Sequence, residues 1–310
     1  MVTGAEVGRV TMLAIDDDRK YLDALFRDSR KLGIDLLQAA SLEEGKEILE
    51  GAGGRSIAGI ILDVECYRRR SDETPDSGFI IAATKYFTEK APDTPLVAIT
   101  GVQPLYDRYR KDFDGIWKVY RKGRDEAEML RYLRERAFGL ERVKVVHRYH
   151  DAVEIAGKYL GEDAAADLAD CLIGMGETSP HRIRGTLANL RTLQERIYVA
   201  LHGFRPDMVP EAFVVFRGKG EAGKSSVNVA RILEHLKGNY DPKTQRYEGT
   251  IHIHHRSATY RFSEMVYKVT SDGIHALDGD GPAKPTRYTV QAVTFALLDL
   301  LLWLKETAGK

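Results

Sequence analysis

The chain has 310 residues with 46 basic and 46 acidic side chains, and 43% of its residues are apolar. This length favours two domains, and the balanced charge gives no global field that would attract nucleic acid or an anionic membrane. Two cysteines exclude a disulfide-rich scaffold, so we expect a cytoplasmic protein. The longest apolar stretch, 295–304, is interrupted by Asp299 and is shorter than the roughly 20 residues of a membrane span.

The first part of the chain alternates short apolar runs with segments of helical periodicity. We expect strands at 10–15, 35–39, 57–62, 96–99 and 116–120, and helices at 21–32, from Ser41 onward, 79–87, 105–113 and 125–138. Asp18 is expected to cap the first helix, and Ser41 with Glu44 has the spacing of a capping box. This alternation predicts an α/β domain over residues 1–138, with a five-stranded, doubly wound parallel sheet.

The second part of the chain differs in character. Residues 139–150 are highly charged and are predicted to form a linker helix. Helical periodicity then dominates at 150–160, 164–173, 183–201, 226–236 and 288–305, so residues 151–310 are predicted to form a mainly α-helical domain. The apolar run 212–216 suggests a strand within it.

Polar residues stand at the ends of four of the predicted strands. Asp16 and Asp17 follow the first apolar run, Asp63 and Thr100 end the third and fourth, and Lys122 follows the fifth. The carboxyl ends of parallel strands meet at one edge of a sheet, so these side chains should converge. Paired carboxylates favour a hard divalent cation, and a third carboxylate beside it can attack phosphorus. A hydroxyl and an ammonium can hold the transferred phosphoryl oxygens.

The segments LAIDDD, GIILDV, VAITG and VYRKG, which carry these five residues, resemble the receiver domain of two-component response regulators. The resemblance implies that Asp63 accepts a phosphoryl group from a sensor histidine kinase or a phosphotransfer protein. It implies that Asp16, Asp17 and Asp63 hold Mg²⁺, and that Thr100 and Lys122 contact the product. It also implies a phosphorylation-dependent surface, so an output partner or a homodimer is expected.

The sequence departs from the family pattern at three places. The loop that follows Asp63 is longer than usual and carries three consecutive arginines at 68–70, which are expected to be mainly solvated. Gly123 follows Lys122 where family members usually have proline. Val119 lies three residues before the lysine, where family members usually have an aromatic residue that takes part in switching. A receiver fold that is not phosphorylated is therefore an alternative.

The second domain contains a sharper local motif. Residues 218–225, GKGEAGKS, satisfy the Walker A pattern and follow the apolar run 212–216. In a P-loop, nucleotide phosphates and their Mg²⁺ would be held by Gly218, Gly223, Lys224 and Ser225. The more ordinary interpretation, a glycine- and lysine-rich loop before a helix, is favoured because the region before it is helical and no strand-borne acid follows.

Two weaker patterns complete the second domain. Arg196 and His202 have the Arg-x5-His spacing of HEPN-type ribonuclease domains, and His252, His254 and His255 could bind a metal. Solvated or rim positions are favoured for both sets. The leading prediction is a response regulator whose helical output domain acts by protein interaction or self-association. The competing prediction is an enzyme, in which the receiver gates a nucleotide-dependent or RNA-cleaving domain.

Overall fold

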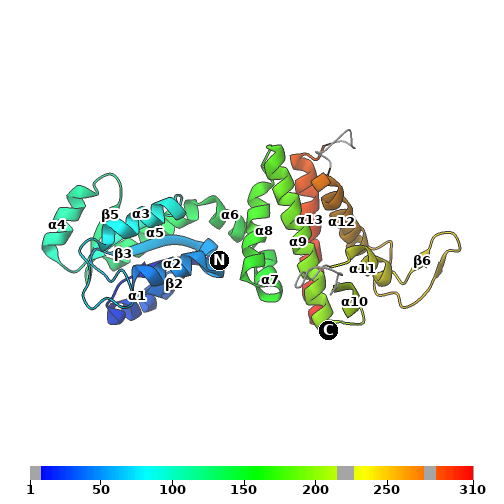
Figure 1. The fold of residues 1–310 in the computed structure, drawn as a ribbon, viewed down its shortest axis with the longest axis horizontal. Coiled ribbons are helices and arrows are strands. Elements are labelled where there is room, and N and C mark those ends of the chain that lie inside the picture. The colour runs from blue at the N-terminus through cyan, green and yellow to red at the C-terminus, as the bar shows by residue number, and fades with distance from the viewer. Residues whose placement is uncertain (1–7, 215–226, 276–283, 310) are drawn as a thin grey trace, which may run out of the picture. The chain divides into compact units, whose positions relative to one another are not determined.

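The computed structural model describes residues 8–214, 227–275 and 284–309. The chain forms two compact units, Met1–His147 and Arg148–Lys310 (Figure 1). The first is an α/β unit and the second is mainly helical, so the predicted fold class is confirmed.

The first unit is built on one sheet of five parallel strands in the order β2-β1-β3-β4-β5. The strands are β1 (Val10–Ile15), β2 (Ile34–Ala39), β3 (Ile57–Asp63), β4 (Leu96–Thr100) and β5 (Lys118–Arg121). All seven residues of β3 are buried, as expected for a central strand that is covered on both faces. The register pairs Asp63 with Ile99 and Thr100 with Arg121, so the carboxyl ends of β3, β4 and β5 lie side by side.

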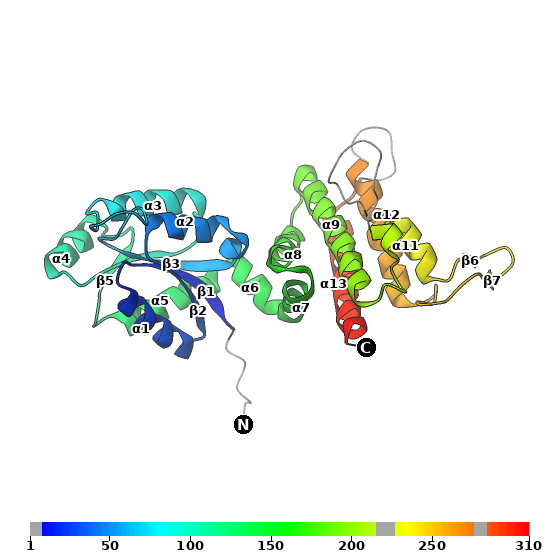
Figure 2. The same cartoon turned by 60° about the horizontal axis from the view of Figure 1, so that its bottom comes forward.

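Helices cover both faces of this sheet (Figure 2). One face packs against α2 (Leu42–Glu50), α3 (Phe79–Lys90) and α4 (Gln103–Asp112), and the other against α1 (Arg19–Lys31) and α5 (Glu126–Gly139). A short 3-10 helix, η1 (Ala52–Ser56), precedes β3. Neighbouring residues of β3 serve different cores: Ile60 and Leu62 belong to the α2–α4 side, and Ile61 to the α1–α5 side.

Two helix starts follow the local chemistry that the sequence predicts. Asp18 caps α1 because its side chain accepts hydrogen bonds from the amides of Lys20 and Tyr21. Ser41 caps α2 by accepting a hydrogen bond from the amide of Glu44. Asp18 therefore serves the helix, and Asp16 and Asp17 are the acidic residues left at the end of β1.

The second unit consists of helices with one small hairpin. Its elements are α7 (His150–Leu160), α8 (Glu162–Gly174), α9 (Pro180–Phe204), α10 (Glu211–Val214), α11 (Val229–Leu236), β6 (Tyr240–Asp241), β7 (Arg246–Tyr247), α12 (Ala258–His275) and α13 (Arg287–Ala308). The long helices α9, α12 and α13 pack on one another, and α7 packs on α8. Before them, α6 (Glu141–Arg148) spans the division between the two units.

One element of the second unit differs from its prediction. The run 212–216 was expected to be a strand, but the structure has the short helix α10 at Glu211–Val214. In the described part of this unit, β6 and β7 pair only with each other. The apolar run 212–216 therefore has no neighbouring strand there with which it could form backbone hydrogen bonds. Pro210 begins the turn instead, and its carbonyl accepts a hydrogen bond from the amide of Phe213 at 3.0 Å.

Helix α13 is long and apolar enough to cross a bilayer by length and composition, a property that core helices share. Here Val290, Leu297 and Leu304 are fully buried within the second unit, where α13 packs against α9 and α12. Its apolar character is therefore accounted for in large part by the core of this unit.

Candidate functional site

The structure gathers the predicted residues of the first unit at the carboxyl edge of the sheet. Asp16, Asp63 and Thr100 are buried, and Asp17 is half-buried beside the two aspartates. Lys122 follows β5 directly, and its amide donates a hydrogen bond to the carbonyl oxygen of Thr100 at 2.9 Å. The convergence that the sequence predicts is therefore present.

Lys122 lies between two carboxylates. Its Nζ donates a hydrogen bond to Asp63 Oδ2 at 2.6 Å and forms an ion pair with Asp16 Oδ2, also at 2.6 Å. The same nitrogen lies 4.9 Å from the centre of the Tyr21 ring. One cation is thus paired with two buried anions, so the cluster retains net negative charge.

This arrangement shifts the acidity of both carboxyl groups. Burial and the charge of Asp16 raise the pKa of Asp63 to about 7, although the ammonium of Lys122 opposes the shift. Burial likewise raises the pKa of Asp16 against the attraction of Lys122. For Lys122, burial lowers the pKa, but the charges of Asp63 and Asp16 outweigh it and the net shift is upward. The site therefore favours any added positive charge.

The acidic residues fit a divalent metal ion. Asp16, Asp17 and Asp63 each offer one oxygen, and these atoms lie within 4.8 Å of one another. Asp16 Oδ2 is buried and makes no hydrogen bond of good geometry, so it has lone pairs available to a ligand. Oxygen-only ligands select hard cations such as Mg²⁺. Among the residues that the structure describes, no other group of three His, Cys, Asp or Glu side chains is close enough to hold a metal.

Thr100 is positioned by its own loop. Its side-chain oxygen accepts a hydrogen bond from the amide of Val102 at 3.2 Å. This bond leaves the hydroxyl proton available as a donor at the sheet edge. Asp63 is held in a similar way, because its Oδ1 accepts a hydrogen bond from the amide of Val64 at 2.7 Å.

The long loop after Asp63 is fastened to α2. The carbonyl oxygens of Tyr67 and Arg68 accept hydrogen bonds from the first amides of that helix, those of Leu42 and Glu43, both at 3.0 Å. Two ion pairs reinforce it at 2.6 Å, Arg70 with Glu47 and Arg68 with Asp76. All three arginines are exposed, and the ion-pair partners of Arg68 and Arg70 lie in the loop and α2 rather than in the acidic cluster.

The backbone at position 123 favours glycine over the proline that receiver domains usually have there. Its backbone φ is +76°, in the left-handed region that favours glycine. Its amide also donates a hydrogen bond to Glu126 Oε1, which a proline could not do. The loop after Lys122 is therefore built on a different turn.

Sequence reasoning missed two residues at the cluster. Tyr21, in the first turn of α1, lies beside Lys122. Cys66 is fully buried three residues after Asp63, and burial together with the charges of Asp17 and Asp63 raises the pKa of its thiol. Their nearness in sequence to Asp17 and Asp63 was the only signal, and it does not separate them from ordinary core residues.

Within the described residues of the second unit, the predicted motif residues are not brought together into a site. Gly218, Gly223, Lys224 and Ser225 lie outside the described residues, and the segment before them is helical rather than the strand a P-loop requires. Arg196 lies 3.8 Å from Asp167, whereas His202 contacts the carbonyl oxygen of Val209 at 2.7 Å. Six residues along a helix place two side chains roughly 120° apart, so the pair faces different neighbours.

The three histidines of 252–255 are also divided. His252 lies near His235, with their ring centres 5.3 Å apart, and His254 stacks on His255 with ring centres 4.7 Å apart. His255 stacks in turn on Tyr240. These aromatic contacts give the hairpin region its own packing, and the trio does not form a joint metal site in the described structure.

Comparisons with known proteins give structural likenesses but no sequence match. No protein-family model matches the chain, and no curated protein matches it. A solved structure, the signal receiver domain of an HD domain-containing protein from Pseudomonas fluorescens Pf-5, is similar over 44% of this chain and 93% of that chain. The sequence identity is 16% and the TM-score is 0.34. The chemistry of the site therefore rests on its own residues.

Proposed function

We propose that the chain is a response regulator that accepts a phosphoryl group on Asp63. The observation that carries this proposal is the position of Lys122, within 2.6 Å of both Asp16 and Asp63 at the end of the parallel sheet. Acceptor, metal ligands, hydroxyl and ammonium then occupy one edge, as phosphoryl transfer to a carboxylate requires.

The transfer follows from these residues. Asp16, Asp17 and Asp63 would hold Mg²⁺, which when bound supplies positive charge beside the transferred oxygens. A carboxylate oxygen of Asp63 attacks phosphorus in line while the phosphorus–nitrogen bond of a phosphohistidine donor breaks, and the electron pair stays on the imidazole. Lys122 and the hydroxyl of Thr100 stabilise the phosphoryl oxygens of the acyl phosphate.

The decisive experiment is phosphorylation of the full chain with acetyl phosphate and Mg²⁺, read by intact mass. We expect one phosphate adduct on the natural protein, none on Asp63→Asn, and an undiminished adduct on Asp28→Asn, an exposed carboxylate of α1 that pairs with Lys31. A folded natural protein that acquires no adduct would remove the proposal in favour of a receiver fold without phosphotransfer.

We further propose that the output is self-association through α13. Three apolar residues of this helix, seven residues apart, are exposed: Tyr288 by 63%, Phe295 by 51% and Leu302 by 39%. In a coiled-coil seam, apolar residues occupy two positions of each seven-residue repeat, and these three residues occupy one of those positions in successive repeats.

Light scattering after size exclusion tests this output. We expect acetyl phosphate with Mg²⁺ to change the mass of the natural protein, and Phe295→Ser to abolish the larger species. Val199→Ser on α9, a similarly exposed apolar residue away from the repeat, is the matched control. An unchanged larger species in Phe295→Ser would exclude α13 as the contact while leaving phosphorylation of Asp63 unaffected.

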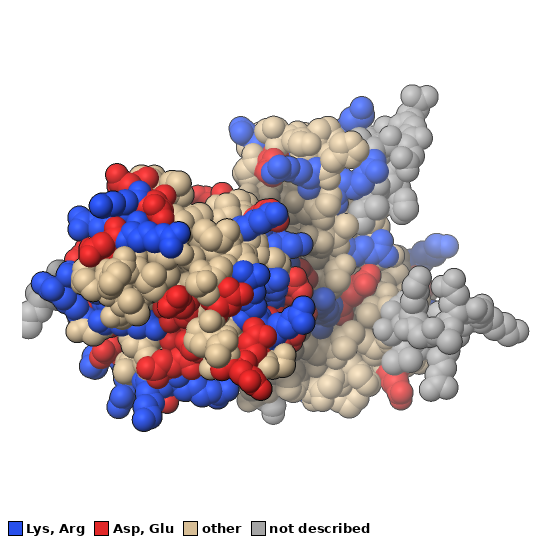
Figure 3. All heavy atoms as spheres, turned by 60° about the vertical axis from the view of Figure 1, so that its left-hand side comes forward, with Lys and Arg blue, Asp and Glu red and all other residues tan. Residues whose placement is uncertain are grey.

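Charge patterning supports a protein partner over nucleic acid. On the face of the first unit that Figure 3 shows, basic and acidic side chains are interleaved. Nucleic-acid binding relies on a cluster or stripe of basic residues. The equal totals of 46 basic and 46 acidic residues agree with this pattern.

A further inference from the structure

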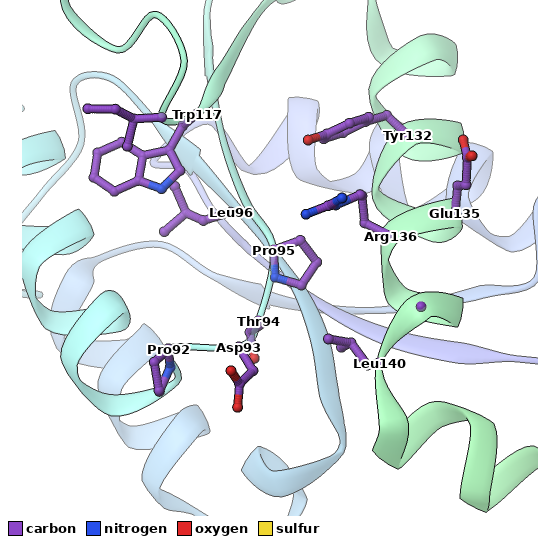
Figure 4. Close-up of a pocket in the computed structure, with 12 residues that line it drawn as sticks. Pro92, Asp93, Thr94, Pro95, Leu96, Trp117, Tyr132, Glu135, Arg136 and Leu140 are labelled. Carbon is purple, nitrogen blue, oxygen red and sulfur yellow. The ribbon is translucent and has the colours of Figure 1, made fainter.

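The first unit contains a hollow at the edge of the sheet that lies opposite to Asp63. It lies where β4 and β5 begin, beside the last turns of α5, and has a volume of about 520 Å³ (Figure 4). This volume is within the range of small-molecule sites, roughly 300–1,000 Å³. None of the residues that form the acidic cluster lines it, so it is separate from the proposed phosphorylation chemistry.

Hydrogen-bond donors converge in this hollow. Figure 4 shows the Arg136 guanidinium and the Tyr132 hydroxyl extending from α5 into the space in front of Pro95, with Trp117 and Leu96 across that space. A guanidinium only donates hydrogen bonds, and a tyrosine hydroxyl donates readily. Within the described part of the chain, neither of these two groups has a hydrogen bond or an ion pair; the ring contacts of Tyr132 are aromatic or cation–π.

The cation of the lining is Arg136. The carboxylates that line its rim, Asp93 and Glu135, point away from the Arg136 guanidinium (Figure 4). The ammonium of Lys118 lies 4.1 Å from the centre of the Tyr132 ring and adds a second cation nearby. A ligand that fills the hollow therefore meets donors and positive charge at one end.

The other end of the hollow is apolar. Ile116, which is 65% exposed, belongs to this lining together with Trp117 and Pro92. An apolar group that covers this side chain removes apolar surface from water, which favours binding. The lining thus combines a surface for an apolar body with a pocket of donors for its charged group.

We propose that this hollow binds a small organic anion. Arg136 and Tyr132 receive its carboxylate or phosphate group, and its planar apolar body rests on Ile116 and Pro92. A guanidinium pairs with either oxyanion through parallel hydrogen bonds, so the shared chemistry is an acceptor-rich anionic group on an apolar body. β4 and β5 run from this hollow to Thr100 and Lys122, so occupancy and phosphorylation share the same two strands.

Tryptophan fluorescence tests the proposal in the full chain. The chain has two tryptophans, so Trp303→Phe leaves Trp117 as the reporter. This protein is titrated, without Mg²⁺, with phenyl phosphate, with benzoate, and with benzylamine as the cationic analogue. We expect a saturable change with the anions and none with benzylamine. A preference for phenyl phosphate or for benzoate then identifies the charged group as phosphate or carboxylate.

Variants locate the binding. Arg136→Gln should weaken the anion by about ten-fold or more, because a charge-assisted hydrogen bond is lost. Tyr132→Phe should weaken it by less, and Arg131→Gln, an exposed arginine on the same helix, should bind like the parent. Equal affinity in Arg136→Gln, equal binding of benzylamine, or no saturable change with either anion would overturn the proposal. Acetyl phosphate labelling of Asp63 in the same variants reports separately on the other site.

Discussion

Asp16 and Asp63 share one cation, because Lys122 Nζ lies 2.6 Å from Oδ2 of each carboxylate. A single ammonium cannot neutralise two buried carboxylates, so the cluster is under electrostatic strain until further positive charge arrives. Metal binding and phosphoryl transfer both act on this imbalance.

Removal of the Lys122 side chain should strongly lower the free energy of unfolding of the metal-free protein. In Lys122→Ala, two buried carboxylates lose the cation that pairs with both of them, and breaking a buried pair costs about 3–5 kcal/mol. We expect the free energy of unfolding, from urea titration at pH 8, to fall by an amount of this order, and Mg²⁺ to restore part of it. A loss below about 1 kcal/mol would show that water already screens the cluster.

The pH dependence of stability has a definite sign. In the folded state the pKa of Asp63 is about 7, above its ordinary value of 3.8, so the native state holds the proton more tightly. The resulting stability is lost as the pH rises from about 4 to about 7. We expect the metal-free protein to be less stable at pH 8 than at pH 5 through this group, by on the order of 2 kcal/mol. Asp63→Asn should flatten the profile and be the more stable protein at pH 8.

Magnesium should stabilise the folded protein through Asp17. Asp17 is half-buried and belongs to the acidic group, so Asp17→Asn should change the metal-free melting temperature little. It should, however, abolish most of the Mg²⁺-dependent increase seen by scanning calorimetry. Asp18→Ala is the control: it loses the α1 cap, at a cost of about 1 kcal/mol, and should keep the full response to Mg²⁺.

The turn after Lys122 should reject the residue that the family usually has there. Gly123→Pro removes the amide that donates to Glu126 and forces φ away from +76°, so we expect a destabilisation of about 3 kcal/mol or more. Gly123→Ala keeps the amide and should cost only about 1–2 kcal/mol for its left-handed backbone. Equal stabilities of the two variants would show that the loop rearranges freely.

The sequence predicted the first unit well because each of its signals is local. The apolar run at 57–62 and the acid that ends it are enough to predict a buried strand and a side chain at its carboxyl end. Parallel pairing then determines which strand ends are neighbours, so Asp63, Thr100 and Lys122 could be expected to meet. Helix starts at Asp18 and Ser41 are equally local, since the capping side chains bind amides two or three residues away.

Features that depend on distant contacts escaped prediction. The run at 212–216 has strand-like residues, but its structure depends on whether a partner strand lies beside it, and Glu211–Val214 is helical. The arginines at 68–70 are exposed, as expected, but the ion pair of Arg70 with Glu47, far away in the sequence, could not be foreseen. The hollow beside Trp117 combines residues of α5, of the start of β4 and of the segment before β5, and no spacing in the sequence reveals it.

The backbone of residues 67–68 provides the acceptors for the first amides of α2. Hydrogen exchange at Leu42 and Glu43 therefore reports on this loop rather than on the helix alone, since these amides become accessible when the loop detaches. An inserted segment at 67–68 would leave the start of α2 without acceptors, whereas an insertion at the exposed residues 73–75 would leave both hydrogen bonds intact. The loop beside Asp63 thus has one stretch that tolerates added length and one that does not.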